Sequence, residues 1–351
     1  MATLHHVNSR RLIRQLITAL ALLALLSPTA FAQVFCVYDP MGTAGDYFSL
    51  FKDYQVEAKR WNVNIDLVPY SEDSKLIEAF DAGRCDMASM IGLRSRNYNL
   101  FTGSIDSPGT IEDYVEMRSL LSLVNSPRLD KYMVSGNYEV VGVLPVGAGY
   151  AVVNDHSING INKAAGKKAA VPAWDKTGRI LATGIKATPV LLDLPQYGPA
   201  FSKGDVDIIV VPLVLYKPME LDKAIAKNGG GIVRRPLMQF TMQIVAHRDK
   251  FPEQFGSRSR DFIGHQVDHS LSIARNMENG VDNRNWIYAP RIEYAEWNST
   301  MQTIGSTLVR EGYLDRRMLG ILRRIRCKST PDDPECKDLN DQQAVKQEQK
   351  P

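Results

Sequence analysis

A short pattern that occurs twice places the strongest limit on how this chain can fold. Residues 79–86 run into the apolar stretch 87–90, and residues 200–207 run into the apolar stretch 208–211. Each copy has a phenylalanine three residues before a glycine and an aspartate three residues after it. This spacing predicts a helix that ends at a left-handed glycine, followed by a short link and a buried strand. Because the copies are about 120 residues apart, we expect two α/β lobes of similar plan; one α/β domain with two similar turns is the alternative.

The N-terminal residues have the composition of a secretory leader. Arg10, Arg11 and Arg14 precede an apolar run at 16–26, and Ala30-Phe31-Ala32 supplies the small residues that signal peptidase requires. The apolar run is too short to span a bilayer. We therefore expect a signal peptide that is cleaved after Ala32.

The charge of the chain depends largely on that leader. The chain has 42 Lys and Arg residues and 39 Asp and Glu residues. The predicted leader contains three arginines and no acidic residue, so the remaining chain has no net charge. This balance argues against nucleic acid as a partner. No later stretch reaches membrane-spanning length.

The four cysteines of an exported chain predict two disulfides. Cys36 lies in the first predicted strand and Cys85 lies just before the third, and these strands would be neighbours in a doubly wound sheet. We therefore expect Cys36 to pair with Cys85. Cys327 and Cys336 flank a short segment with two prolines and would close a small C-terminal loop. Four buried thiols are the alternative.

The apolar pattern predicts alternating strands and helices along most of the chain. In the first half we expect strands at 34–38, 64–68 and 86–90, helices at 43–59 and 71–80, and largely helical structure at 91–127. The first helix would begin at a capping box formed by Thr43 and Asp46. In the second half we expect long β-rich runs at 138–153 and 232–247, strands at 168–171 and 188–192, and a helix at 176–186. The two long runs suggest strands that cross between lobes.

These elements predict an α/β fold with two lobes, each a doubly wound sheet flanked by helices. The predicted segments are a signal peptide (1–32), the first lobe (33–137), and the second lobe with crossover strands (138–246). The next segment (247–327) is expected to contain C-terminal helices that pack on the lobes, with helices at 260–279 and 301–326. The chain is expected to end in a disulfide-closed loop with a disordered tail (328–351).

The order of elements resembles a type II periplasmic solute-binding protein of the TRAP-transporter (DctP-like) family. The resemblance rests on the leader, the strand and loop at 34–42, the pattern Phe80-x-x-Gly83-x-x-Asp86, and residues 160–212. The last of these is similar to the family's run from a GxK strand to a GxxD strand. Within the class, the chain resembles a group often labelled as RND-efflux or aminoglycoside-resistance proteins.

The resemblance implies a monomer in the periplasm of a Gram-negative bacterium, without enzymatic activity or a cofactor. Such a protein captures a small molecule in a cleft between its lobes and delivers it to a membrane transporter, either a TRAP-type permease or an efflux assembly. An accessory or sensor protein of an efflux or signalling system is the alternative function. A hydrolase with an unrecognised set of catalytic residues is a third hypothesis.

Two positions depart from the pattern of the resembled family. The family's carboxylate-binding arginine aligns with Ala170, and an amide that the family often has after the GxxD strand aligns with Val211, before Pro212. A pocket without these two groups is not expected to hold a simple dicarboxylate in the family's way.

The loops at the carboxyl ends of the predicted strands are the expected ligand surface. Trp174 is the strongest candidate, because an indole in such a loop is a common ligand platform; packing in the core or between lobes is its alternative. Turn formation at Asp39 and a solvated helix start at Arg94 and Arg96 are alternatives for those residues. The acidic and aromatic candidates suit an amine, whereas the arginines suit an anion. The full set of candidates is Asp39, Met41, Thr43, Ser89, Arg94, Arg96, Trp174, Asp175, Lys176 and Tyr216.

Two other features favour structural interpretations. His265 and His269 would share a helix face, but the intervening Gln-Val-Asp lacks the glutamate of a metalloprotease motif, so we expect a solvated face and no metal. The basic and apolar residues at 316–326 predict an amphipathic helix packed on its apolar side, with a docking surface for a membrane partner as the alternative.

Overall fold

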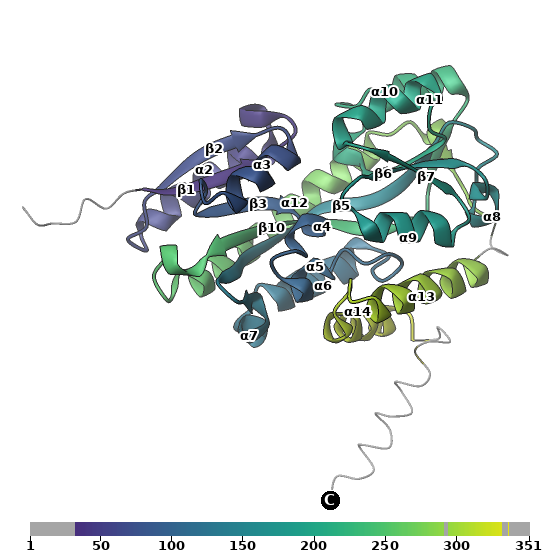
Figure 1. The fold of residues 1–351 in the computed structure, drawn as a ribbon. Helices are drawn as coiled ribbons and strands as arrows, with labels where there is room; N and C mark the ends of the chain where they lie inside the picture. Colours follow the sequence, from purple (N-terminus) through teal and green to yellow (C-terminus); the bar gives the residue numbers. More distant parts are fainter. Residues whose placement is uncertain (1–31, 291–293, 332–335, 337–351) are drawn as a thin grey trace, which may run out of the picture. The chain divides into compact units, whose positions relative to one another are not determined.

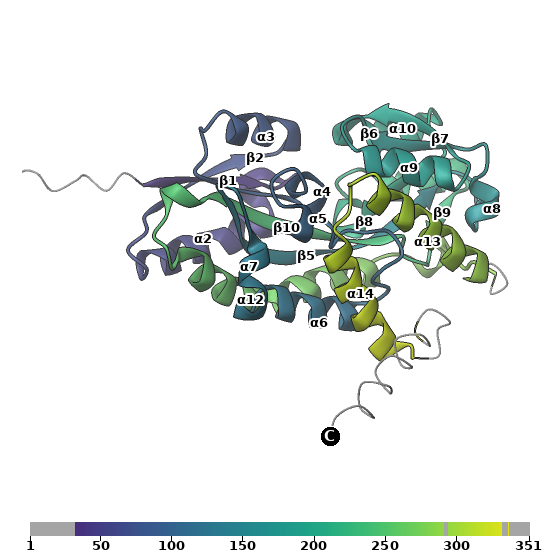
Figure 2. The same ribbon diagram turned by 60° about the horizontal axis from the view of Figure 1, so that its bottom comes forward.

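In this computed structural model, the N-terminal part of the sheet is built from parallel strands (Figure 1). The structure describes residues 32–290, 294–331 and 336. The predicted signal peptide (apart from Ala32) and the tail after Cys336 therefore lie outside the described residues. Strand β1 (Gln33–Tyr38) lies between β2 (Ile65–Tyr70) and β3 (Met87–Ile91). Helices α2 (Asp46–Lys59) and α3 (Asp73–Asp81) connect these strands and cover opposite faces of the sheet (Figure 2).

The C-terminal part of the sheet repeats this arrangement. Strand β6 (Lys168–Pro172) lies between the parallel strands β7 (Thr188–Leu192) and β8 (Ile208–Pro212). The connections are α9 (Lys176–Gly184) and α10 (Tyr197–Lys203), the latter preceded by a 3₁₀ turn at Leu194–Gln196. The predicted order of strands and helices is thus confirmed in both halves, with boundaries that differ by a few residues.

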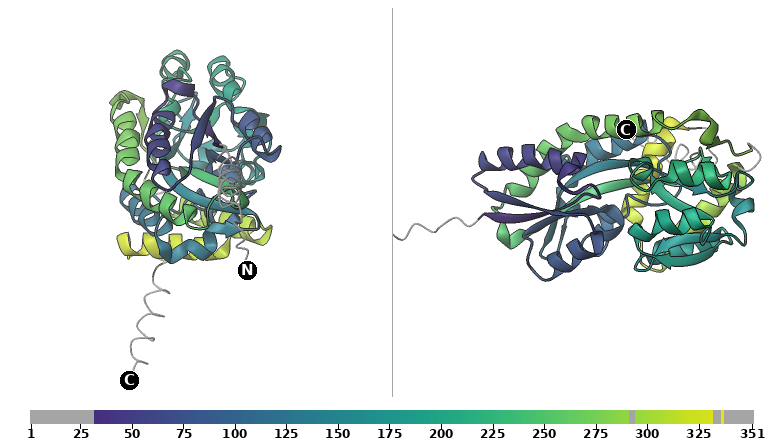
Figure 3. Two further views of the ribbon diagram at one scale, coloured as in Figure 1. Left: turned by 90° about the vertical axis from the view of Figure 1, so that its left-hand side faces the viewer. Right: turned by 90° about the horizontal axis from the view of Figure 1, so that it is seen from above.

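Two long antiparallel strands join the two parts (Figures 1 and 3). Strand β5 (Tyr138–Val153) pairs with β10 (Met238–His247), β10 pairs with β3, and β5 pairs with β8. The strand order is β2-β1-β3-β10-β5-β8-β6-β7. This order is symmetric about the β10–β5 pair, so we define β2, β1, β3 and β10 as the N-terminal half-sheet and the other four strands as the C-terminal half-sheet.

The hydrogen-bonded ladder is continuous through this pair, which corrects the expectation of a separate sheet in each lobe. The continuity follows from the length of β5, whose first part pairs with β10 and whose last residues, from Gly149 on, pair with β8. Within the part that pairs with β10, the register shifts at Phe240/Thr241, beside Gly147 with its positive φ of 135°. A glycine is required there because other residues rarely adopt that backbone conformation.

The second predicted β-rich run is divided in two. Strand β9 (Gly231–Val233) pairs with β5 and with β11 (Trp286–Ile287), and β10 begins only at Met238. The intervening segment contains Pro236, which lacks the N–H that a ladder needs. A two-residue strand, β4 (Val134–Ser135), also pairs with β5.

The remaining helices of the described chain cover the sheet and the end of the fold. Helix α12 (Phe255–Asn279) packs along β5 (Figure 2). The two elements are so close that a Cβ atom at Gly142 would come within 2.7 Å of the Ile263 side chain. The predicted helical region at 301–326 is two helices, because the chain turns at Gly312 with a φ of 77°. The other described helices are α4 (Gly92–Ser95), α5 (Leu100–Gly103), α6 (Tyr114–Val124), α7 (Asp130–Met133), α8 (Ile161–Ala164), α11 (Leu221–Asn228), α13 (Tyr294–Arg310) and α14 (Arg316–Ser329).

The two copies of the repeated pattern have the same structure. Gly83 and Gly204 end α3 and α10 with φ values of 70° and 80°. The Asp86 carboxylate accepts a hydrogen bond from the Val34 N–H of β1 (2.8 Å), and the Asp207 carboxylate accepts one from the Lys168 N–H of β6 (2.7 Å). Asp86 therefore connects the start of β3 to the neighbouring strand β1, and Asp207 connects the start of β8 to the neighbouring strand β6. The buried phenylalanines Phe80 and Phe201 belong to two different apolar clusters, as the predicted duplication requires.

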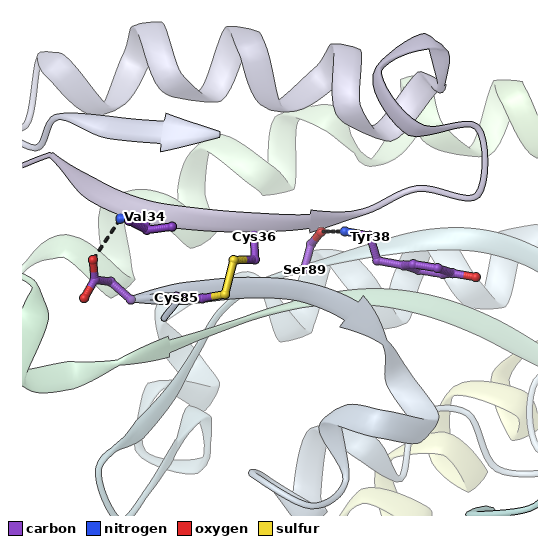
Figure 4. Close-up of a disulfide and its surroundings, with 6 residues drawn as sticks. Val34, Cys36, Tyr38, Cys85 and Ser89 are labelled. Atoms are coloured by element: carbon purple, nitrogen blue, oxygen red, sulfur yellow. Dashed lines mark hydrogen bonds between the residues drawn. A yellow bond between two sulfur atoms is a disulfide. The ribbon is translucent and has the colours of Figure 1, made fainter. Parts of the chain in front are cut away.

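Both predicted disulfides are present. Cys36 in β1 is joined to Cys85, which lies two residues before β3 (Figure 4). Their Cα–Cα distance is 5.8 Å, and both residues are buried. Cys327, near the end of α14, is joined to Cys336.

The predicted capping box at the start of α2 is wrong. Thr43 lies in a 3₁₀ turn (Gly42–Ala44), and the helix begins at Asp46 after Gly45. The Asp39 carboxylate instead accepts hydrogen bonds from the N–H groups of Tyr47 (3.1 Å) and Phe48 (3.2 Å). A Cβ atom at Gly45 would overlap that carboxylate, so a glycine at this position leaves the room that the cap needs.

The other structural expectations concern surfaces. His265 and His269 are both exposed on α12. On α14 the apolar residues Met318, Ile321 and Leu322 are buried, which confirms the amphipathic helix. None of the helices in the described ranges has the length and apolar character needed to cross a bilayer.

Candidate functional site

A cavity of about 150 Å³ lies where the carboxyl ends of parallel strands from both half-sheets meet. Tyr38 and Ile91 end β1 and β3 on one side, and Pro172 and Pro212 end β6 and β8 on the other. The crossing strands complete the lining with Val146, Met238, Phe240 and Met242. This is the position at which open α/β sheets bind ligands.

Most of the lining is apolar. Asp175 is the only charged side chain among the described residues that line the cavity. The apolar members include Leu93, Ala170, Val171, Leu181, Val210, Val211, Val214, Leu215 and Leu237. Such a lining favours a ligand that is itself largely apolar.

Three tyrosines supply polar atoms to the lining. The Tyr47 hydroxyl donates a hydrogen bond to the Pro145 carbonyl (2.7 Å), which holds it against β5. Tyr197 is 2% exposed, and its hydroxyl has no hydrogen-bond partner among the described residues. Burial raises the pKa of Tyr38, Tyr47 and Tyr197, so all three phenols stay protonated at neutral pH and can donate hydrogen bonds.

Asp175 is held by the start of α9. Its carboxylate accepts hydrogen bonds from the Thr177 N–H (2.9 Å) and the Thr177 hydroxyl (2.5 Å), so it caps the helix. The Thr177 hydroxyl in turn accepts a hydrogen bond from Arg96 (2.9 Å), a residue that follows α4. Burial lowers the pKa of Arg96, and the nearby Asp175 and Asp106 carboxylates oppose that shift. This chain of hydrogen bonds connects a loop of the N-terminal half-sheet to a helix of the C-terminal half-sheet.

A second contact joins the same two regions. The Arg94 guanidinium stacks on the Trp174 ring, with its Cζ atom 3.6 Å from the ring centre. It also forms a salt bridge with Asp73, with 2.8 Å between Nη2 and Oδ2. Trp174, in the loop between β6 and α9, packs against the apolar cluster of the N-terminal half-sheet. Arg94 therefore holds together α3, its own helix α4 and the Trp174 loop.

Four of the ten predicted ligand residues take part in contacts that join the two half-sheets: Arg94 stacks on Trp174, and Arg96 and Asp175 both bond to Thr177. Of these four, only Asp175 lines the cavity. Asp39 caps α2, as described above. The Ser89 hydroxyl accepts a hydrogen bond from the Tyr38 N–H (3.2 Å), within the sheet (Figure 4).

The other four candidates also lie outside the cavity lining. Met41 and Thr43 are exposed in the loop after β1. Lys176 is exposed, with its ammonium 5.7 Å from the centre of the Tyr313 ring. Tyr216 is buried in the C-terminal apolar cluster, and its hydroxyl accepts a hydrogen bond from Asn285 (3.0 Å).

Sequence reasoning missed the tyrosines and the residues of the crossing strands. The predicted candidates come mainly from loops that follow strands, whereas Tyr38 is the last residue of β1, Tyr47 lies in α2 and Tyr197 is the first residue of α10. The position of Tyr38 at a strand end was a usable signal. Phe240 and Met242 gave none, because an apolar residue in a β-rich run is ordinarily part of a core.

The two departures noted in the sequence are both at the cavity. Ala170 and Val211 line it, and neither can bond to a carboxylate.

The fold is that of TRAP periplasmic solute-binding proteins. One such protein, from Desulfovibrio salexigens with bound orotic acid, superposes with a TM-score of 0.67 at 15% identity, covering 85% of this chain and 98% of that one. Another, from Pseudomonas aeruginosa PAO1 with bound L-malate, gives a TM-score of 0.61 at 13% identity over 78% and 99% of the two chains.

The chain belongs to the family described as "Solute-binding protein AdeT 1/2", whose model matches residues 55–342. A relative named "Probable solute-binding protein AdeT1", from Acinetobacter baumannii, is 35% identical over 306 residues, which is 87% of this chain and all of the relative. "Probable solute-binding protein AdeT2" of the same species is 26% identical over 234 residues, 67% of this chain and 98% of the relative.

Proposed function

We propose that the chain is a periplasmic binding protein that captures a small molecule in the cavity between the half-sheets and delivers it to a membrane transporter. The observation that carries this proposal is the position of the cavity. It is lined by the strand ends of both half-sheets and by the two strands that join them. The proposed activity is binding, without catalysis.

The proposed mechanism is closure of two lobes over the ligand. The predicted lobes, residues 33–137 and 138–246, would turn about the long strands β5 and β10, with Gly147 at the register shift as a flexible point. The Arg94–Trp174 stack and the Arg96–Thr177 hydrogen bond would form on closure, because each joins the N-terminal to the C-terminal half-sheet. A ligand that contacts both lobes would favour the closed arrangement.

Export and the transporter partner are supported by the chain and its relatives. The leader-like residues 1–32 and the two disulfides suit an oxidising compartment. The shared fold suggests a TRAP-type permease as the partner. We expect the exported chain to act as a monomer.

Native mass spectrometry of the exported protein, followed by thermal unfolding with each molecule found, tests the binding function. We expect a co-purifying small molecule that raises the unfolding temperature by several degrees, since a ligand that binds only the folded state stabilises it. The Ala170→Phe variant, with its cavity partly filled, is expected to lose the ligand-dependent rise. Lys176→Ala, at an exposed position outside the cavity, is the matched control and should keep it. The absence of any bound molecule and of any thermal response to a broad metabolite panel would contradict the proposal.

A further inference from the structure

The cavity offers no cation to a bound anion. None of the described residues that line it is a lysine or arginine. The two arginines predicted as ligand residues have partners within the protein. Arg94 contacts Asp73 and Trp174, and Arg96 donates hydrogen bonds to the Thr177 hydroxyl and the Gly103 carbonyl. A carboxylate placed among these apolar side chains would lose its hydration without an ion pair in return.

Asp175, the one carboxylate that the described residues place in the lining, is also satisfied by the protein. Asp175 accepts two hydrogen bonds from Thr177 at the N-terminus of α9 and lies within electrostatic range of Arg96. The helix N-terminus and the guanidinium both stabilise its negative charge. Asp175 therefore does not require a cationic ligand for charge balance.

The volume of the cavity is sufficient for a small ring. An apolar protein cavity of about 150 Å³ holds one benzene molecule. The aromatic and aliphatic side chains Phe240, Val210 and Met242 provide apolar contacts for a ring of that size.

The Tyr197 hydroxyl supplies the polar contact. It is buried in the lining, and no described residue satisfies it. A buried hydroxyl without a partner costs free energy, which a ligand oxygen or nitrogen at hydrogen-bond distance would recover.

We propose that the solute of this site is an uncharged, largely apolar molecule about the size of one aromatic ring, with one polar group that hydrogen-bonds to the Tyr197 hydroxyl. This inference rests on the proposed binding function and specifies the class of its ligand. It differs from the acids bound to the two TRAP proteins compared above.

Four single-ring probes separate charge from hydrogen bonding: phenol, toluene, benzoate and benzylamine. Calorimetric titration should show phenol binding at least ~100-fold more tightly than benzoate or benzylamine at neutral pH, because a charge must be desolvated in the latter two. Toluene should bind about fivefold more weakly than phenol, since it lacks the hydrogen bond.

Tyr197→Phe removes only the hydroxyl. It should reduce the phenol affinity about fivefold and leave the toluene affinity unchanged. Tyr216→Phe is the matched control, because Tyr216 is a buried tyrosine outside the lining whose hydroxyl has a partner; it should change neither affinity. Circular dichroism confirms that both variants are folded.

The outcomes distinguish this inference from the binding function itself. Tighter binding of benzoate or benzylamine than of phenol would overturn the ligand class and leave the binding function in place. An equal loss of phenol and toluene affinity in Tyr197→Phe would overturn the role of the hydroxyl. If none of the probes binds but mass spectrometry finds a charged or much larger bound molecule, the class is wrong and the function stands.

Discussion

At the scale of single residues, the charged side chains that the sequence suggests as ligand residues mostly bond to other groups of the protein. Asp39 and Asp175 both follow strands, as ligand residues often do, yet each caps a helix with its carboxylate. The physical reason is that the first N–H groups of a helix need acceptors, and an aspartate in the loop before the helix is well placed to provide one. Asp175 also lines the cavity, whereas Asp39 does not, and this difference depends on the tertiary structure.

Asp106 leads to a prediction about pH. This residue is fully buried in the loop between α5 and α6, and its carboxylate accepts hydrogen bonds from the Thr241 N–H (3.1 Å) and hydroxyl (2.6 Å). Burial raises the pKa of Asp106 from 3.8 to about 7, against the opposing effect of these hydrogen bonds and of Arg96. Between these two values the folded protein holds a proton that the unfolded chain releases, so the contribution of Asp106 to stability falls as the pH rises.

The side chain of Asp106→Asn cannot ionise, so the variant should lose the part of the pH dependence of stability that Asp106 causes. Urea unfolding of both proteins at several pH values between about 4 and about 7 measures it. We expect the free energy of unfolding of the unsubstituted protein to fall relative to that of the variant across this window, and the difference to be constant at higher pH. Parallel pH profiles would show that the pKa of Asp106 is not raised in the folded state.

At the scale of elements, the repeated pattern explains why the two half-sheets are alike. In both, a helix ends at a left-handed glycine, and an aspartate then connects the new strand to a neighbouring strand. The N-terminal half-sheet adds a covalent bond at the same place, because Cys85 directly precedes Asp86. The bridge closes a loop with a sequence separation of 49 residues, compared with 9 for the C-terminal bridge.

Removal of the longer bridge should therefore cost more stability. We expect Cys36→Ala/Cys85→Ala to lower the free energy of unfolding by about 2–4 kcal/mol, since the unfolded chain gains the conformations that the bridge excludes. Cys327→Ala/Cys336→Ala should have a smaller effect because its loop is shorter. Denaturant unfolding of the two double variants compares them directly. A larger loss in the second variant would contradict the loop-length explanation.

At the scale of the whole molecule, Trp174 connects the two half-sheets. Its ring lies under Arg94 and packs on the N-terminal apolar cluster, although it belongs to the C-terminal half-sheet. If closure over a ligand forms these contacts, their loss favours the open arrangement and lowers ligand affinity.

Trp174→Ala should weaken binding of the co-purifying molecule at least tenfold, about 1.4 kcal/mol, mainly through faster dissociation. Stopped-flow release and calorimetry measure the rate and the affinity. The exposed neighbour Lys176 provides the control, since Lys176→Ala should leave both values unchanged. An unaltered dissociation rate in Trp174→Ala would remove the stack from the closing mechanism.

The sequence by itself determined the helices and strands and where they end, because these depend on residues that are close together in the sequence. Apolar runs defined β1, β5 and β6, the glycine and aspartate spacing located both helix ends, and the neighbouring strands of a doubly wound sheet led to the pairing of Cys36 with Cys85. Only the tertiary structure decided that the ladder is continuous and which polar groups remain for a ligand. Among the described residues the Tyr197 hydroxyl has no hydrogen-bond partner, whereas Arg96 bonds to Thr177, a residue distant in sequence. Both outcomes depend on how the two half-sheets pack.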